Sequence, residues 1–91
     1  MSEESNPLEV HFFASLRERV GTARLSATAD SLSEVHATLI QQLGTDRVAH
    51  LLAPNVRVAV NQQLIEGDWH SDPQPLPAGA EVAFLPPVTG G

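Results

Sequence analysis

The chain has 91 residues, of which 42% are hydrophobic and 18% charged, a size and composition typical of one soluble domain. The net charge is −6 and the five basic residues, all arginines, are spread along the chain, which argues against a nucleic-acid-binding face. No apolar run is long enough to span a membrane, and the polar, acidic start does not resemble a signal peptide, so a cytoplasmic protein without a membrane partner is expected. The absence of cysteine excludes disulfides, a thiol nucleophile and cysteine-ligated metal centres, including those of plant-type ferredoxins.

Two antiparallel strands are predicted at the start of the domain. Residues 8–14 alternate in a way that is typical of a strand with Val10 and Phe12 on one face and Phe13 on the other. Residues 24–28 fit a second strand. Because the link between the two segments is short, the strands are expected to pair antiparallel.

Two helical segments are predicted in the first half. The charged residues 15–20 are expected to form a short helix or turn that Gly21 closes. A longer helix is expected to begin at Ser31, because Ser31 and Glu34 have the spacing of a capping box, and to end at Gly44. Its apolar side chains recur at helical spacing: Leu32, Val35, Leu39, Ile40 and Leu43.

The second half is predicted to consist of strands, turns and loops. Residues 45–55 are expected to be irregular, with three side chains available for the core, Val48, Leu51 and Leu52. Three segments predict strands, at residues 56–60, 63–65 and 81–85. Turns are expected at Asn61-Gln62 and throughout the proline-rich residues 66–79.

This order of elements predicts an α+β domain, with one main helix packed on a sheet of four to five strands. The first and last strands are both strongly apolar, so we expect them at the centre of the sheet. The predicted organisation is a flexible segment at residues 1–7, a folded domain at 8–85 and an extended tail at 86–91.

The body of the domain offers no catalytic constellation. No two histidines have the spacing that places two metal ligands on one helix face; they are His11, His36, His50 and His70. The glycines form neither a dinucleotide-binding nor a Walker pattern, so neither a metal nor a bound cofactor is expected. A domain without a site of its own is better explained as a substrate or subunit of other enzymes.

The strongest functional signal is the terminal segment Pro86, Pro87, Val88, Thr89, Gly90 and Gly91. Glycine has no Cβ, so the last two residues can enter a passage too narrow for other residues. Proline lacks an N–H donor and fixes φ, so a stiff, extended arm is expected. Six extended residues reach roughly 20 Å. We expect the carboxylate at the tip to be chemically modified.

Sheet parity also predicts a partner surface. If Val10 and Phe12 face the helix, then Phe13 and Leu85 face away from it, and Leu64 can join them. Three large apolar side chains on the open face of a small sheet favour an interaction patch. The alternative is that the loop at residues 66–79 folds over this face.

Several short segments carry a resemblance to a known family: Phe12-Phe13-Ala14, Arg17-Glu18, Val20-Gly21, Val60-Asn61-Gln62 and, above all, the whole run from Glu81 to Gly91. From about Leu8 to Gly91 the chain resembles the MoaD family, the small subunits of molybdopterin synthase. Looser relatives, such as the thiamin sulfur carriers, share the Gly-Gly end but usually not the complete ending. The resemblance implies a β-grasp, ubiquitin-like fold.

The resemblance also implies a function as a sulfur carrier in molybdenum cofactor biosynthesis. A MoeB-like enzyme would use ATP to adenylate Gly91, and a sulfur donor protein would then displace AMP and leave a thiocarboxylate. The tail would enter a MoaE-like large subunit, which supplies the catalytic groups, and pass its sulfur to cyclic pyranopterin monophosphate. The family suggests a heterotetramer of two small and two large subunits, docked through Phe13, Leu64 and Leu85. An aromatic residue is common in the family where this chain has Leu85.

Two other classes of function remain open from the sequence. The chain can be a ubiquitin-like protein modifier, or a sulfur carrier for thiamin synthesis or tRNA thiolation, with the same activated Gly91. It can also be a non-covalent adaptor, in which case the folded body alone carries the function.

Overall fold

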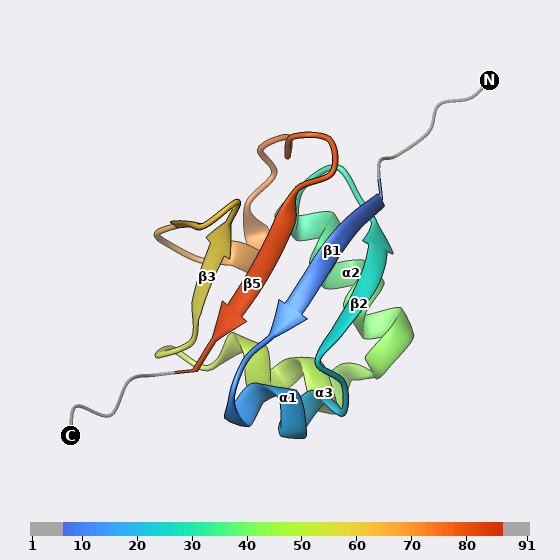
Figure 1. Cartoon of the computed structure of the whole chain (residues 1–91), viewed down its shortest axis with the longest axis vertical. Coiled ribbons are helices and arrows are strands. Elements are labelled where there is room, and N and C mark those ends of the chain that lie inside the picture. Colours follow the sequence, from blue (N-terminus) through green and yellow to red (C-terminus); the bar gives the residue numbers. More distant parts are fainter. Residues whose placement is uncertain (1–6, 87–91) are drawn as a thin grey trace.

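The computed structural model describes residues 7–86, which form one sheet with helices packed on one of its faces (Figure 1). The elements in chain order are β1 (Pro7–Phe12), α1 (Ser15–Val20), β2 (Arg24–Thr28), α2 (Leu32–Leu43), α3 (Thr45–Ala49), η1 (His50–Leu52), β3 (Arg57–Val60), β4 (Gln63–Leu64), η2 (Trp69–Ser71) and β5 (Glu81–Leu85). No helix among these residues has both the length and the apolar character needed to cross a bilayer.

The sheet is mixed and has the strand order β2-β1-β5-β3-β4. β1 pairs with β2 antiparallel and with β5 parallel, and β5 pairs with β3 antiparallel. The first and last strands therefore lie side by side in the middle of the sheet, as predicted from their apolar character. The antiparallel pairing of β1 with β2 is also confirmed.

Local signals explain where the main helix α2 begins and ends. The Ser31 hydroxyl accepts a hydrogen bond from the Glu34 N–H at 3.3 Å, and the Glu34 carboxylate accepts one from the Asp30 N–H at 2.8 Å. The second bond reaches one residue further back than in a standard capping box, but it satisfies an N–H group in the same way. Gly44, with φ +94°, ends the helix as predicted.

Aromatic stacking fills the core between the sheet and α2. Phe12 and Phe84, on the two central strands, stack with ring centroids 5.6 Å apart. Trp69 packs edge-on against Phe84 at 4.7 Å, and its indole N–H donates to the Leu51 carbonyl oxygen at 3.2 Å. These three aromatic rings join the sheet to the segments after α2, so the helical layer and the long loop before β5 share one core.

The prediction that residues 45–55 are irregular is wrong. They form α3 and η1, and the Val48 N–H donates to the Gly44 carbonyl oxygen at 3.1 Å. Val48 and Leu51 lie three residues apart, so one helical turn brings both into the core, where both are buried. Leu52 was expected to contribute to the core, but it is 39% exposed and lies outside it.

The strand ends differ from the predicted ones by one or two residues. β1 begins at Pro7 and ends at Phe12, because Ala14 adopts φ +52° and turns the chain into α1. Asn61 and Gln62, which join β3 to β4, both have positive φ, at 51° and 72°. Such a turn matches the twist of a hairpin, and the predicted turn at this position is confirmed.

Candidate functional site

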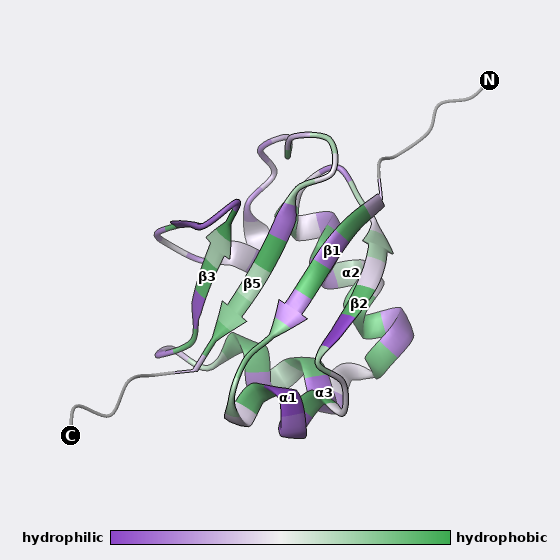
Figure 2. Cartoon of the chain, in the orientation of Figure 1, coloured by the Kyte–Doolittle hydropathy of each residue, from purple (hydrophilic) through white to green (hydrophobic). Residues whose placement is uncertain are grey.

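The sheet has one covered and one open face. Along β1, Val10 and Phe12 are buried under α2, whereas Phe13, immediately beyond the strand, is 44% exposed. Along β5, Val82 and Phe84 are buried in the same way. Figure 2 shows that β5 is hydrophobic along most of its length after a hydrophilic start, whereas β1 alternates between hydrophobic and hydrophilic segments.

The open face carries a shallow apolar hollow of about 410 Å³. We call it the open-face hollow; its lining residues are Phe13, Ala59, Gln62, Leu64, Glu81, Ala83 and Leu85. The strand register brings them together, because Ala59 pairs with both Ala83 and Leu64. Leu64 is 54% exposed and Leu85 is partly exposed. The structure thus brings together the three residues predicted to form a partner surface.

The long loop before β5 does not cover this hollow. It runs along the helical face instead, where the Ser33 N–H of α2 donates to the Asp72 carbonyl oxygen at 3.0 Å. Further along the loop, Pro75 pairs with Ser31 in an isolated antiparallel β-bridge. Trp69, which sequence reasoning did not place in the core, is only 6% exposed and anchors the loop on that side. Among the described residues, the open-face hollow therefore remains accessible to a partner.

A cluster of ionisable groups lies on the open face, at the edge of the hollow. The His11 Nε2 is 3.2 Å from a carboxylate oxygen of Glu9 and 3.6 Å from one of Glu81. The His11 ring also stacks on Phe13, with ring centroids 6.2 Å apart. Glu9 and Glu81 are neighbours in the parallel register of β1 and β5, a relation between distant segments that the sequence alone does not disclose.

The helical face carries a second group of ionisable side chains, His36 and His70, with ring centroids 5.5 Å apart. Burial, and to a lesser degree the neighbouring His70, lowers the pKa of His36. Within residues 7–86, no three histidine, aspartate or glutamate side chains are arranged to hold a metal ion. His36 packs against Trp69 at 5.6 Å, so this group belongs to the anchoring of the loop.

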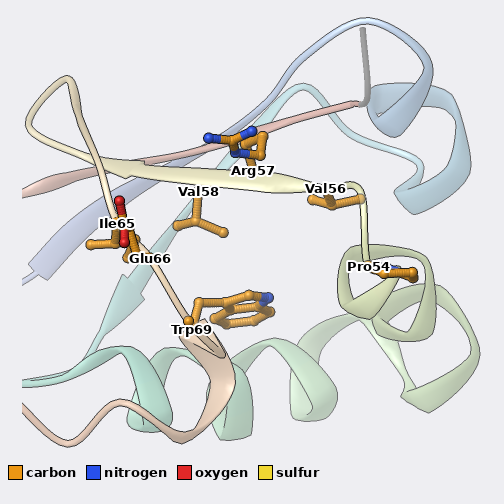
Figure 3. A pocket seen from close by; sticks show the side chains of 8 residues that line it. Pro54, Val56, Arg57, Val58, Ile65, Glu66 and Trp69 are labelled. Atoms are coloured by element: carbon orange, nitrogen blue, oxygen red, sulfur yellow. The ribbon is translucent and has the colours of Figure 1, made fainter. Parts of the chain in front are cut away.

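A further pocket, of about 300 Å³, lies beneath β3 (Figure 3). Val58 points into it towards Trp69, whereas Arg57 points to the opposite side of the strand. Among the described residues that line it there is neither a histidine nor a hydroxyl group, so the lining offers no nucleophile or general base of those types.

The tail continues directly from the strand that lines the open-face hollow. Leu85 ends β5, and Pro86 follows it as the last described residue. The predicted insertion segment beyond it, Pro87, Val88, Thr89, Gly90 and Gly91, lies outside the described residues, as does the predicted flexible start at residues 1–6.

Comparison with known proteins relates this arrangement to a family. The model of the ThiS family matches residues 10–91, which is most of the chain. The chain belongs to the ThiS family. This ThiS-family chain is 40% identical over 85 residues to the molybdopterin synthase sulfur carrier subunit of Escherichia coli K12, covering 92% of this chain and 99% of that protein. The resemblance to the small subunits of molybdopterin synthase is thereby confirmed.

Solved structures of related chains confirm the fold. A chain in the complex of subunits 1 and 2 of the molybdopterin-converting factor from Helicobacter pylori is 26% identical, with a TM-score of 0.65, covering 93% of the ThiS-family chain and 99% of that chain. SAMP1 from Haloferax volcanii has a TM-score of 0.71 at 20% identity, covering 94% of this chain and 100% of its own, a likeness that shows the fold alone. The ubiquitin-like β-grasp fold expected from the sequence is confirmed.

Proposed function

We propose that this chain is the sulfur carrier subunit of a molybdopterin synthase and that Gly91 is the residue that carries the sulfur. The name of the Escherichia coli relative supports the role, and the match over nearly the full length of both proteins supports its transfer to this chain. The family match extends through residue 91, so it includes the Gly-Gly pair. The chain acts as a covalent participant and leaves acid–base catalysis to its partners.

The proposed chemistry proceeds in three steps. A carboxylate oxygen of Gly91 attacks the α-phosphorus of ATP on a MoeB-like enzyme, which releases pyrophosphate and forms an acyl adenylate. A sulfide equivalent from a donor protein attacks the carbonyl carbon and expels AMP, which leaves a thiocarboxylate. In the large subunit the thiocarboxylate sulfur forms a bond to a side-chain carbon of cyclic pyranopterin monophosphate and displaces the oxygen substituent of that carbon, and water then cleaves the acyl–sulfur bond to restore the carboxylate.

The observation that carries the proposal is that β5 connects the open-face hollow to the tail. Its outward side chains line the open-face hollow, and its last residue leads straight into the tail. A protein docked on the hollow is therefore within reach of the tail, since six extended residues span roughly 20 Å. We propose docking of a MoaE-like large subunit there, through Phe13, Leu64 and Leu85, in a heterotetramer of two small and two large subunits.

The first test measures the sulfur on the tail. The chain is incubated with ATP, the adenylating enzyme and the sulfur donor, and its C-terminal peptide is analysed by mass spectrometry. We expect exchange of one oxygen for sulfur, localised to Gly91, and none in a variant lacking Gly90-Gly91. An unmodified peptide in the complete reaction contradicts the proposal. Isopeptide-linked Gly-Gly remnants on lysines of other proteins favour a protein modifier instead.

The second test measures docking with matched variants. Leu64→Asp places a charge in the open-face hollow, whereas Leu52→Asp places one on a leucine of similar exposure in η1, away from the hollow. Truncating or charging an interface anchor commonly costs more than about tenfold in affinity, so Leu64→Asp is expected to lose the large subunit. Leu52→Asp is expected to bind normally. Equal binding by both variants refutes docking on this face.

A further inference from the structure

The two edges of the sheet differ in length. β4, at one edge, has two residues, whereas β2, at the other, has five. Figure 1 shows β2 beside β1, and β1 is its one neighbour in the described sheet. Backbone groups that point outward from an edge strand can pair with a strand of another molecule, and a short edge strand offers few of them. β2 is therefore the edge at which strand addition has to be prevented.

Alternate residues of β2 direct their backbone groups towards β1 and away from it, as in any antiparallel pair. The Phe12 N–H donates to the Ala23 carbonyl oxygen at 2.8 Å, so Ala23 is on the side that faces β1. Arg24 follows Ala23, and Ser26 lies two residues further along. The carbonyl groups of Arg24 and Ser26 therefore point outward, and they are acceptors that an added strand uses.

Both outward carbonyl groups accept hydrogen bonds from side chains of the same chain. The Gln42 amide, near the end of α2, donates to the Ser26 carbonyl oxygen at 3.2 Å. The Thr22 hydroxyl, in the link between α1 and β2, donates to the Arg24 carbonyl oxygen at 2.9 Å. We call Thr22 and Gln42 the edge donors. They come from different segments, yet they reach successive outward carbonyl groups of one strand.

The edge donors occupy space that an added strand needs. Neighbouring strands lie about 4.7–4.9 Å apart, and the Gln42 side-chain nitrogen is 3.2 Å from the Ser26 oxygen on the outer side of β2. A second strand must displace the amide and the hydroxyl before its own N–H groups can reach these oxygens. The side chains of β2 give less protection, because Arg24 is the one charged residue among its five.

We propose that Thr22 and Gln42 close the β2 edge to strand addition and thereby keep this chain from pairing with a second copy of itself. Two β2 edges can pair antiparallel about a two-fold axis, with their Ser26 residues opposite each other. The inference goes beyond the proposed sulfur transfer and does not depend on it. The open-face hollow is lined mainly by β3, β4 and β5, so the closed edge is a separate surface of the molecule.

A purely structural role for the two bonds makes a different prediction. Both bonds are exposed, so water can replace either partner when a donor is removed. If the bonds only supported the fold, their loss would lower the melting temperature slightly and leave the chain monomeric. If they close the edge, their loss leaves the fold nearly unchanged and permits association. The oligomeric state is therefore the measurement that separates the two roles.

The test compares two double variants that remove the same kinds of polar group. Thr22→Val/Gln42→Ala removes the edge donors, whereas Thr45→Val/Gln41→Ala makes the same replacements at exposed positions of α2 and α3. Self-association is measured by sedimentation equilibrium from about 10 µM to 1 mM protein. The experiment uses about 0.3 M salt, which screens the repulsion between copies that each carry a net charge of −6.

We expect Thr22→Val/Gln42→Ala to associate at least about tenfold more tightly than the unaltered chain, and the control to match the unaltered chain. Backbone amide exchange locates the contact, because the outward N–H groups of Ser26 and Thr28 are expected to exchange more slowly as the variant associates. Gln42→Ala alone is expected to give a weaker effect. Gln42→Lys supplies a new donor and a charge at the edge, so it is expected to remain monomeric.

Several outcomes refute the inference. One is an edge-donor variant that stays monomeric at every concentration, and another is a control that associates equally. Association without slower exchange in β2 also refutes it, because the contact then lies elsewhere. Circular dichroism checks that each variant is folded. If the double variant fails to fold, Gln42→Ala is compared with Gln42→Lys, and equal behaviour of these two variants refutes the role of Gln42.

Discussion

Trp69 is predicted to be the residue on which the stability of the long loop depends. It is 6% exposed, packs edge-on against Phe84 and donates its indole N–H to Leu51. Truncating a buried tryptophan to alanine costs about 3–5 kcal/mol. The hydrogen bond contributes about 0.5–1.5 kcal/mol, and the aromatic contact a similar amount. Trp69→Phe, which keeps a ring but loses the N–H, is therefore expected to cost about 1–2 kcal/mol.

These energies translate into measurable melting temperatures. For a domain of this size, 1 kcal/mol corresponds to a shift of roughly 4–8 °C. Trp69→Ala is expected to lower the melting temperature by at least about 12 °C, and Trp69→Phe by about 4–16 °C. Urea unfolding, followed by far-ultraviolet circular dichroism, gives the free energies. This signal is preferable because Trp69 is the single tryptophan of the chain, and its replacement removes the fluorescence.

A variant on the other face of the sheet serves as the control. Phe13 is also aromatic but 44% exposed, so Phe13→Ala is expected to change the free energy of unfolding by no more than about 1 kcal/mol. Its effect is expected on docking instead. Trp69→Phe is expected to bind the large subunit normally below its melting temperature. A free energy of unfolding for Trp69→Ala within about 1 kcal/mol of the unaltered chain refutes the assignment of Trp69 as the loop anchor.

Three further predictions concern pH and backbone conformation. Burial, followed by the neighbouring His70, lowers the pKa of His36 below its ordinary value of 6.5, so the folded state binds fewer protons than the unfolded state. The contribution of His36 to stability is therefore fully present above pH 6.5 and is lost as the pH falls through the pKa of folded His36. His36→Gln is expected to reduce this loss, measured as the free energy of unfolding from urea titrations at a series of pH values. Gln62→Gly is expected to raise stability by about 0.5–1 kcal/mol in thermal melts, because Gln62 holds φ +72° in the β3–β4 turn; a loss of stability contradicts this. Gly21→Ala is expected to cost at least about 1 kcal/mol in the same assay, because φ is +90° and the added Cβ meets the Arg47 guanidinium at 3.1 Å; an unchanged melt refutes it.

The strands and the residues of the open face could be predicted because they follow from a pattern that repeats between near neighbours in the sequence. Side chains alternate every two residues along a strand, so burial of Phe12 and Phe84 places Phe13 and Leu85 on the opposite face. The main helix was equally predictable, since Ser31 lies at a start signal and apolar side chains follow at helical spacing.

Features that depend on contacts between distant segments could not be predicted. Trp69 stands alone in a polar, proline-rich stretch without periodicity, and only the fold brings Phe84 and Leu51 to it. The pairing of Glu9 with Glu81 requires the parallel register of β1 and β5. The helical turn at residues 45–52 was missed because the segment between Gly44 and Pro54 is too short to show a clear helical pattern. Its helical conformation is stabilised by the burial of Val48 and Leu51 in the core, which the local sequence does not reveal.

The position of β5 has a consequence for synthesis on the ribosome. β5 lies between β1 and β3, so without it β3 and β4 have no strand to connect them to the other half of the sheet. The core ring Phe84 arrives with this strand, and pairing it with β1 joins two segments from opposite ends of the described chain. Contacts of such long sequence separation form late. A nascent chain therefore completes its domain only after Leu85 has left the exit tunnel, and truncated products expose the apolar edges of two unfinished half-sheets to proteolysis.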